Sequence, residues 1–476
     1  MKKSRIPLSL RGALPCALAL FSAMAVPQEA RPQAVKPASV AMELSLPPVE
    51  SFLAGNGMKM FFMRDELPQV TIVLSAGYGR LYENARTAGM AELMAKSVIL
   101  GGSKKYPGEA LHTVVESVGG RIGIEAGWET TVISIRMLAR HAGLAFDIVS
   151  DLVKNPNFDA KYIGDARGML IEGVRRKMDS PEAIAFEKVR ELIFAGTGYG
   201  AVTTEKSLNS ITAEEMARAW RIYFRGGNII AGMSSSIAIN DLREMAMGVF
   251  GDVMKGEGLP YPADRIKIEG DVRNQAKKIF LVPKAVPQAT IVMGTVAPPV
   301  GDPRAYALSV MNYILGEGSF NSRLMQEIRV KRGLSYSVQS IMRFRRDLGL
   351  FLAFAQTRTD QADQAFDLML QNVRLMATAP VSGEELDWAR SSMIYSYIFD
   401  FETPLEVLAQ YSMVQYNRLP ERYLADYTKM IGAVTKEMVL AGADELLKNG
   451  LVRVVVGDES LKGPLSKFGE VVVVQP

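Results

Sequence analysis

The sequence has almost no cysteine or histidine, and this shortage excludes several kinds of active site. Cys16 is the only cysteine, so a disulfide framework is excluded. The only two histidines, His112 and His141, are 29 residues apart, so the chain cannot place two imidazoles one turn apart on a helix. We expect both to be ordinary helix-face or loop residues. Gly77-Tyr78-Gly79 is too short for a nucleotide loop and is typical of a turn at a strand end.

The N-terminus lacks an apolar run long enough for an ordinary membrane span. Four basic residues within the first eleven positions precede an apolar run over 12–26, and Ala23-Met24-Ala25 supplies small residues for cleavage. This order is typical of a secretory signal peptide, so we predict that residues 1–25 are removed and that the chain is exported, with the bacterial periplasm as its expected location. A membrane anchor is the alternative, but no stop-transfer segment follows.

Removal of this segment also removes the excess of positive charge. Lys+Arg falls from 55 to 51, which equals the 51 Asp+Glu, so a nucleic-acid partner has no electrostatic support. Cys16 leaves with the segment, and Pro15 before it argues against a lipoprotein box. Residues 26–46, which contain Pro27, Pro32 and Pro37, are typical of an extended leader.

The length of 476 residues predicts at least two domains, and short motifs repeat along the chain. Residues 99–103 return at 314–319, 145–147 at 365–367, and 227–230 at 449–452. Because the motifs return in the same order and at similar offsets, we predict two homologous α+β lobes, 47–253 and 276–476, that form a clamshell. Residues 254–275, which begin with Gly256, Gly258, Pro260 and Pro262 close together, are the predicted linker.

Hydrophobic periodicity predicts the elements of the first lobe. Strands are expected over 58–63, 69–76, 122–126, 130–137 and 228–234. Helices are expected over 88–100, 108–118, 141–154, 160–178, 181–194 and 240–250, with Thr87 as the cap of the first.

One stretch of the second lobe, 322–338, combines a helix, a turn and a strand. Leu324, Ile328 and Val330 would lie on the apolar side of the helix, Gly333 suits the position just past its C-terminus, and 334–338 alternates like a strand. This junction would present the Arg332 guanidinium and the Tyr336 hydroxyl at one rim, where both can donate to an oxygen that gains negative charge. The alternative is a C-cap arginine and a half-buried strand tyrosine.

The motif Ser-Arg-Leu-x-Gln-Glu-Ile-Arg-x-Lys-Arg-Gly-Leu-Ser-Tyr-Ser-Val resembles the C-terminal-lobe signature of the pitrilysin/insulinase metallopeptidases, the inverted zincins that include mitochondrial processing peptidase. In that family an arginine and a tyrosine of this loop hold the substrate backbone over a zinc site on the other lobe. The matching positions are Arg332 and Tyr336. The resemblance runs from about residue 50 to the C-terminus and implies a mixed six-stranded sheet backed by helices in each lobe, with 119–124 as the edge strand that pairs with substrate in active members.

The same resemblance implies that the zinc site is degenerate. Glu92 and Lys96 occupy the histidine positions of H-x-x-E-H, Ala95 occupies that of the general base, and the distant ligand falls at Gly173, beside Glu172. We therefore expect no metal or cofactor in this chain, and a helix-stabilising ion pair between Glu92 and Lys96. A site built from Glu92 and Glu172 is the alternative, and it would favour a hard ion over zinc.

Three functions follow from these observations. The first, which we prefer, is a zinc-free subunit that pairs with a homologous H-x-x-E-H chain, where the zinc is expected, and lends it Arg332 and Tyr336. It accounts for the loss of one half of the site and the retention of the other. The second is a non-catalytic scaffold or peptide-binding protein of the same fold. The third, an autonomous enzyme with another chemistry, has no supporting motif.

Overall fold

The structure is a computed structural model that describes residues 45–258 and 265–475. The predicted signal peptide and nearly all of the predicted leader lie outside the described residues. No helix in these two ranges has the length and apolar character that crossing a bilayer requires.

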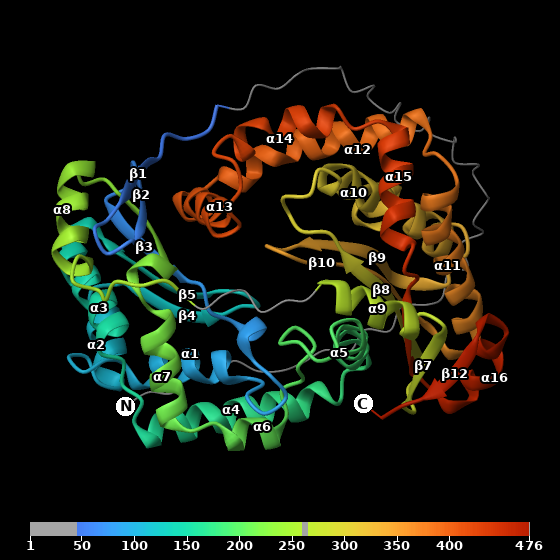
Figure 1. Ribbon diagram of the computed structural model, residues 1–476, viewed down its shortest axis with the longest axis horizontal. Coiled ribbons are helices and arrows are strands. Elements are labelled where there is room, and N and C mark those ends of the chain that lie inside the picture. Colours follow the sequence, from blue (N-terminus) through green and yellow to red (C-terminus); the bar gives the residue numbers. More distant parts are fainter. Residues whose placement is uncertain (1–44, 259–264, 476) are drawn as a thin grey trace, which may run out of the picture. The chain divides into compact units, whose positions relative to one another are not determined.

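The first half of the described chain contains six strands and eight helices (Figure 1). In chain order they are β1 (Glu50–Leu53), β2 (Lys59–Arg64), β3 (Gln69–Ala76), α1 (Met90–Gly101), α2 (Glu109–Ser117), β4 (Arg121–Ala126), β5 (Thr131–Leu138), α3 (Ala142–Lys154), α4 (Ala160–Lys177), α5 (Pro181–Ile193), α6 (Glu205–Ser210), α7 (Ala213–Tyr223), β6 (Ile229–Ser235) and α8 (Ile239–Phe250).

The second half has the same kinds of element. They are α9 (Arg265–Gln275), β7 (Lys278–Pro283), β8 (Gln288–Ala297), α10 (Ala305–Asn312), β9 (Ser335–Phe344), β10 (Gly349–Arg358), α11 (Ala362–Thr378), α12 (Gly383–Ser396), α13 (Pro404–Tyr416), α14 (Tyr423–Gly432), α15 (Lys436–Leu447), β11 (Val452–Gly457), α16 (Lys462–Leu465) and β12 (Glu470–Val473). Two π-helical segments, Tyr313–Glu317 and Met325–Val330, lie between α10 and β9.

The described chain forms two six-stranded mixed sheets, and this confirms the expected two-lobed α+β fold. The strand orders are β1-β2-β6-β3-β5-β4 and β12-β7-β11-β8-β10-β9. The inner strands correspond one to one: β2 and β6 are parallel, as are β7 and β11, and the remaining inner pairs are antiparallel in both sheets. The outer strands break the correspondence, because β1 runs antiparallel to β2 whereas β12 runs parallel to β7.

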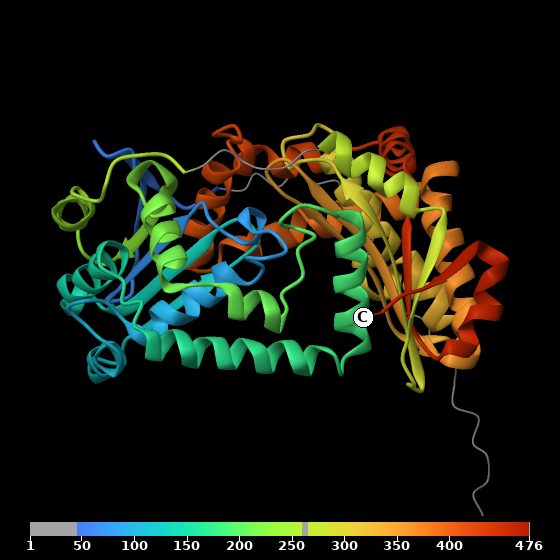
Figure 2. The ribbon, with the colours of Figure 1, turned by 60° about the horizontal axis from the view of Figure 1, so that its bottom comes forward.

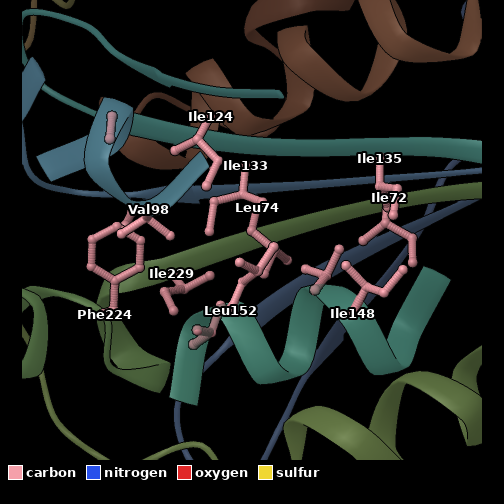
Figure 3. Close-up of a cluster of buried hydrophobic side chains, with 14 of the residues drawn as sticks. Ile72, Leu74, Val98, Ile124, Ile133, Ile135, Ile148, Leu152, Phe224 and Ile229 are labelled. Atoms are coloured by element: carbon pink, nitrogen blue, oxygen red, sulfur yellow. The ribbon is translucent and has the colours of Figure 1, made fainter. Parts of the chain in front are cut away.

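The core of the first sheet lies between its strands and α3 (Figure 3). Ile72 and Leu74 of β3 and Ile133 and Ile135 of β5 point toward Ile148 and Leu152 of α3 in this view, and all six side chains are buried. Alternation along the strands creates this face because successive residues of a strand point to opposite sides of the sheet.

The opposite face of each sheet is covered by a helix from the other half of the chain. Leu408 of α13 packs against Phe61 of β2 and Ile230 of β6, and a side chain at Gly232 would place its Cβ 3.0 Å from the Leu408 Cβ. In the second sheet, α5 packs on β8 and β11, and Figure 2 shows it as an upright green helix against the yellow and orange strands. Each lobe therefore contributes one helix, α13 or α5, to the hydrophobic core of the other.

The predicted linker contains a packed helix, so this part of the prediction needs correction. Its second half forms α9, whose Ile268 and Val272 are fully buried against α5 and the second sheet. The two residues are four apart, which is helical spacing, but the glycines and prolines that precede them dominated the sequence pattern.

Candidate functional site

The 322–338 stretch folds as a helical turn, a glycine and the start of a strand, as predicted, and this strand, β9, lies at the edge of the second sheet. Leu324 and Ile328 are fully buried, and Gly333 has φ +63°, the left-handed conformation expected just past a helix. The prediction for Val330 was wrong: this side chain is 54% exposed. Residues Met325–Val330 form a π-helical turn. Val330 comes two residues after Ile328, which is about 200° around an α-helix, so helical periodicity itself places it on the opposite side from Ile328.

Hydrogen bonds anchor this loop on both sides. Before the turn, the Arg323 guanidinium makes two bonds to the Glu385 carboxylate, at 2.7 and 2.8 Å. After it, the Ser335 hydroxyl donates to the Gln356 carbonyl at 2.6 Å, and the Thr357 hydroxyl donates to the Leu334 carbonyl at 2.6 Å. A loop fixed at both ends holds the residues between them in one place, as a binding site requires.

Arg332 is bound to the helix that precedes it. Its Nη1 donates to the Glu327 carbonyl at 2.8 Å and to the Glu327 carboxylate at 2.6 Å. Lys331, first, and Arg332 together lower the pKa of that carboxyl. The side chain is still 38% exposed. Arg332 thus acts as a helix cap in this conformation and keeps part of its side chain exposed.

Tyr336 is the most exposed large hydrophobic residue near the loop. It is 84% exposed, so it is not the half-buried strand tyrosine of the alternative interpretation. The Arg329 guanidinium lies 5.8 Å from its ring centre and 5.1 Å from that of Phe320. In the described chain, Tyr336 and Arg332 lie at the same end of β9 but do not bond to each other.

The degenerate zinc positions lie where α1 and α4 pack together. Ala95 is buried and carries no polar atom, and Gly173 has no side chain. The Glu92 carboxylate accepts a hydrogen bond from the Arg80 guanidinium at 2.8 Å, so the predicted pair with Lys96 was wrong. Glu172 is exposed and pairs with Arg176 at 3.6 Å, within its own helix.

These residues do not fit a zinc ion. Zinc needs nitrogen, sulfur or carboxylate ligands. Lys96 offers an ammonium, Ala95 a methyl group and Gly173 no side chain, and the Glu92 carboxylate is already paired with Arg80. In residues 45–258 and 265–475, no three His, Cys, Asp or Glu side chains gather closely enough to hold a metal ion. His112 lies 3.0 Å from the Ile99 carbonyl, and the His141 ring accepts from Arg140.

Sequence analysis missed a buried carboxylate at the start of α1. Glu83 is 6% exposed, and its two oxygens accept from the backbone N–H groups of Gly89 and Ala91, each at 2.8 Å. It therefore caps this helix in place of the predicted Thr87, whose hydroxyl instead accepts from the backbone of Asn84. Burial raises the pKa of Glu83 to about 7, although the two N–H groups oppose the shift.

This shift predicts that Glu83 makes stability fall as pH rises. The carboxyl has a pKa near 4.5 when unfolded and about 7 when folded, so its contribution is complete below pH 4.5 and is lost as pH rises through 7. The loss amounts to about 3 kcal/mol. Glu83→Gln replaces the carboxyl with an amide that does not titrate. Urea titrations between pH 4.5 and 7.5 give the free energy of unfolding of both proteins. We expect the wild-type value minus the variant value to decrease by this amount over that range. Parallel pH curves for the two proteins would contradict the assignment.

β4 forms one edge of the first sheet, where the resemblance places a substrate-pairing strand. In the described chain it pairs only with β5, in antiparallel register from Arg121 opposite Arg136 to Ala126 opposite Thr131. Its other edge can accept an added strand, because an edge strand carries unpaired backbone N–H and C=O groups.

Comparisons with known proteins give one consistent result. Residues 61–206 match the family described as Insulinase (Peptidase family M16), and residues 210–393 match the one described as Peptidase M16 inactive domain. Together the two matches span well over half of the chain. Among relatives, a protein named Uncharacterized zinc protease YmxG of Bacillus subtilis is 22% identical over 75% of this chain and 85% of its own length. An Uncharacterized zinc protease of Rickettsia felis is 23% identical over 68% and 76%.

Solved structures show the same fold. The crystal structure of a peptidase M16 inactive domain from Pseudomonas fluorescens aligns with a TM-score of 0.77 and 22% identity, over 86% of this chain and 98% of that one. A protease from Helicobacter pylori aligns with a TM-score of 0.77 and 16% identity, over 86% and 100%. With matched sequence regions in both halves and the two-sheet fold in common, this chain belongs to the insulinase family of peptidases, peptidase family M16.

Proposed function

We propose that this chain is the non-zinc-binding subunit of a metallopeptidase assembly. It would supply Arg332 and Tyr336 to a homologous partner chain that carries H-x-x-E-H and the zinc. The observation that carries the proposal is the 84% exposure of Tyr336 on a loop that is anchored at both ends. A large aromatic side chain held out into solvent contributes nothing to the core of its own chain, so it is available to a ligand or a partner.

The residues of this chain would bind and orient the peptide. The Tyr336 hydroxyl and the Arg332 guanidinium would donate hydrogen bonds to the scissile carbonyl oxygen or to the adjacent backbone of the peptide. Such donors favour the transition state because the oxygen carries more negative charge there than in the substrate. Arg332 would exchange its contact with Glu327 for the substrate. An exposed ion pair of this kind holds only weakly.

Export is part of the proposal. The basic and apolar N-terminal segment supports removal of residues 1–25 and assembly in the periplasm. The substrate would be a peptide, since both proposed contacts are made to backbone atoms.

The proposal predicts that the mature chain alone contains no stoichiometric zinc and that a homologous H-x-x-E-H chain accompanies it in its native compartment. Isolation of the native complex, peptide mapping of its chains and metal analysis before and after their separation would test this. We expect the zinc to remain with the partner, because the α1 and α4 positions of this chain offer no ligand set. A zinc-spiked control sample measures recovery. One tightly held zinc per separated chain of this protein, or isolation with no such partner, would overturn the proposal.

A scaffold or peptide-binding protein is the second candidate. The observation that favours it is the double contact of Arg332 with the Glu327 carbonyl and carboxylate, which satisfies a helix C-terminus without any ligand. This role predicts that Arg332 and Tyr336 are dispensable for the turnover of any complex.

A further inference from the structure

A small cavity in the second half of the chain contains two arginines. It measures about 130 Å³ and lies between α11, the C-terminal end of α15 and the start of β11. Arg374 of α11 and Arg453 of β11 line it, together with Leu370, Leu447 and Leu451. The cavity is distant in sequence from the Arg332–Tyr336 loop and plays no part in the proposed peptide contacts.

Arg453 is a buried cation inside a hydrophobic strand. It is 6% exposed, and the neighbouring residues Val452 and Val454 are fully buried. Its register partners Ile279 and Met293 belong to the core on the α11 and α15 side of the sheet, so Arg453 extends from that face. The strand already holds four valines, and a fifth valine or a leucine would fill this position without burying a charge, so the arginine calls for a specific partner.

The protein satisfies the Arg453 guanidinium only in part. Nη1 donates to the Phe468 carbonyl at 3.1 Å and Nη2 donates to the Ala276 carbonyl at 2.8 Å. The buried Nε has no hydrogen-bond partner. A guanidinium has five N–H donors in a rigid fork that fits two oxygens of one anion, whereas both of these acceptors are neutral carbonyls.

The surrounding charge is positive and uncompensated. Neither Arg374 nor Arg453 forms an ion pair with any carboxylate of residues 45–258 and 265–475. Burial, and then the positive charge of Arg374, lower the pKa of Arg453. A buried charge without a counter-charge is unfavourable, and two cations that face one space make it more so. The cavity therefore has the electrostatics of an anion site.

The backbone leaves room for such an anion. Gly450, which also lines the cavity, has φ +79°, and a Cβ at this position would lie 2.7 Å from the Ala276 Cβ. Gly450 thus lets the turn after α15 approach Ala276, another residue of the cavity wall, closely. The two carbonyl contacts account for the hydrogen bonds of the two terminal nitrogens of Arg453. They do not account for the Nε without a partner or for a second arginine, Arg374, at the same cavity.

We propose that this cavity binds a small oxyanion of the size and charge of inorganic phosphate. The Arg453 guanidinium would attract the anion from within the sheet by its charge, and Arg374 would close over it from α11. Leu370, Leu447 and Leu451 would exclude water on the remaining sides. The bound anion would connect α11 to β11, and so stabilise the second half of the chain.

Thermal unfolding of the full mature chain tests the proposal, with inorganic phosphate titrated against sodium chloride at constant ionic strength. A ligand that binds only the folded state raises the Tm with its concentration, so we expect phosphate to raise the Tm of the wild type where chloride does not. Sulfate and acetate form two further arms: a response to sulfate identifies any tetrahedral dianion as the ligand, and a response to acetate alone identifies a carboxylate.

Two variants locate the site. Arg374→Gln alters an exposed side chain, so the protein should fold normally while phosphate binds about tenfold or more weakly, since one charged contact is lost. Arg453→Met should remove the response, because it removes the guanidinium that attracts the anion from within the sheet. Arg176→Gln, at a 73% exposed side chain on α4, is the matched control and should respond as the wild type does. Equal Tm values in phosphate and chloride, or an unchanged response of Arg374→Gln, would overturn the proposal.

Discussion

A complex assembled with Tyr336→Phe and the H-x-x-E-H partner is expected to form normally and to cleave peptides ~10²–10³ times more slowly, the usual effect of removing one oxyanion donor. The substitution keeps the ring, and therefore its contact with the Arg329 guanidinium, and it deletes only the hydroxyl. Because the side chain is 84% exposed, folding should not change. Steady-state turnover and analytical gel filtration of the same sample separate activity from assembly.

Substitutions of Arg332 and of its partner Glu327 distinguish an arginine that binds the substrate from one that only caps a helix. Arg332→Lys keeps the charge but loses the fork, so we expect a similar loss of turnover. Glu327→Gln removes the carboxylate that holds Arg332 at 2.6 Å and should leave turnover unchanged or higher. Tyr395→Phe removes the hydroxyl of a tyrosine that is 40% exposed on α12, and it serves as the control. Full turnover in both Tyr336→Phe and Arg332→Lys complexes would place the scaffold function first.

Val189→Asp is expected to lower the free energy of unfolding by about 3–5 kcal/mol, the cost of an uncompensated buried charge. Val189 of α5 is fully buried in a cluster with Val292 of β8 and Val454 of β11. The aspartate would lie in the contact that joins a helix of the first half to the sheet of the second. Urea denaturation followed by circular dichroism measures the change, and we expect both halves to lose stability in one transition.

A surface substitution of the same chemistry is the control for this variant. Met169 lies on α4 and is 52% exposed, so Met169→Asp should change the free energy of unfolding by less than about 0.5 kcal/mol. If Val189→Asp behaves like this control, α5 does not contribute to the core of the second sheet. Two separate transitions in the variant would show that each half is stable alone.

Features that depend on local sequence were predicted well. The bounds of β3 agree with the prediction at both ends, and the repeated motifs fall at equivalent places, such as the starts of β6 and β11. Alternation and helical periodicity depend only on near neighbours in the chain, so one sequence reveals them. The turn at Gly333 followed from the chirality of the backbone, which favours glycine where φ is positive.

Features that depend on distant contacts were not predicted. A pair between Glu92 and Lys96, one turn apart within α1, was the local choice, but Arg80 reaches the same carboxylate from the 3-10 turn that precedes the helix. Similarly, the Glu83 carboxylate replaced Thr87 as a cap because the chain folds back over the start of α1. For the candidate site, the sequence identified Arg332 and Tyr336, but only the structure shows that one is engaged and the other exposed.

The exchange of helices between the halves has a consequence for synthesis. The first sheet is complete once β6 has been made, at residue 235, yet its outer face is covered by α13, which begins at residue 404. A chain that emerges from the ribosome N-terminus first therefore leaves the apolar side chains around Phe61 and Ile230 uncovered until most of its second half has been made. Exposed apolar surface promotes aggregation, so the interval between the synthesis of β6 and that of α13 is when this chain is most prone to aggregate.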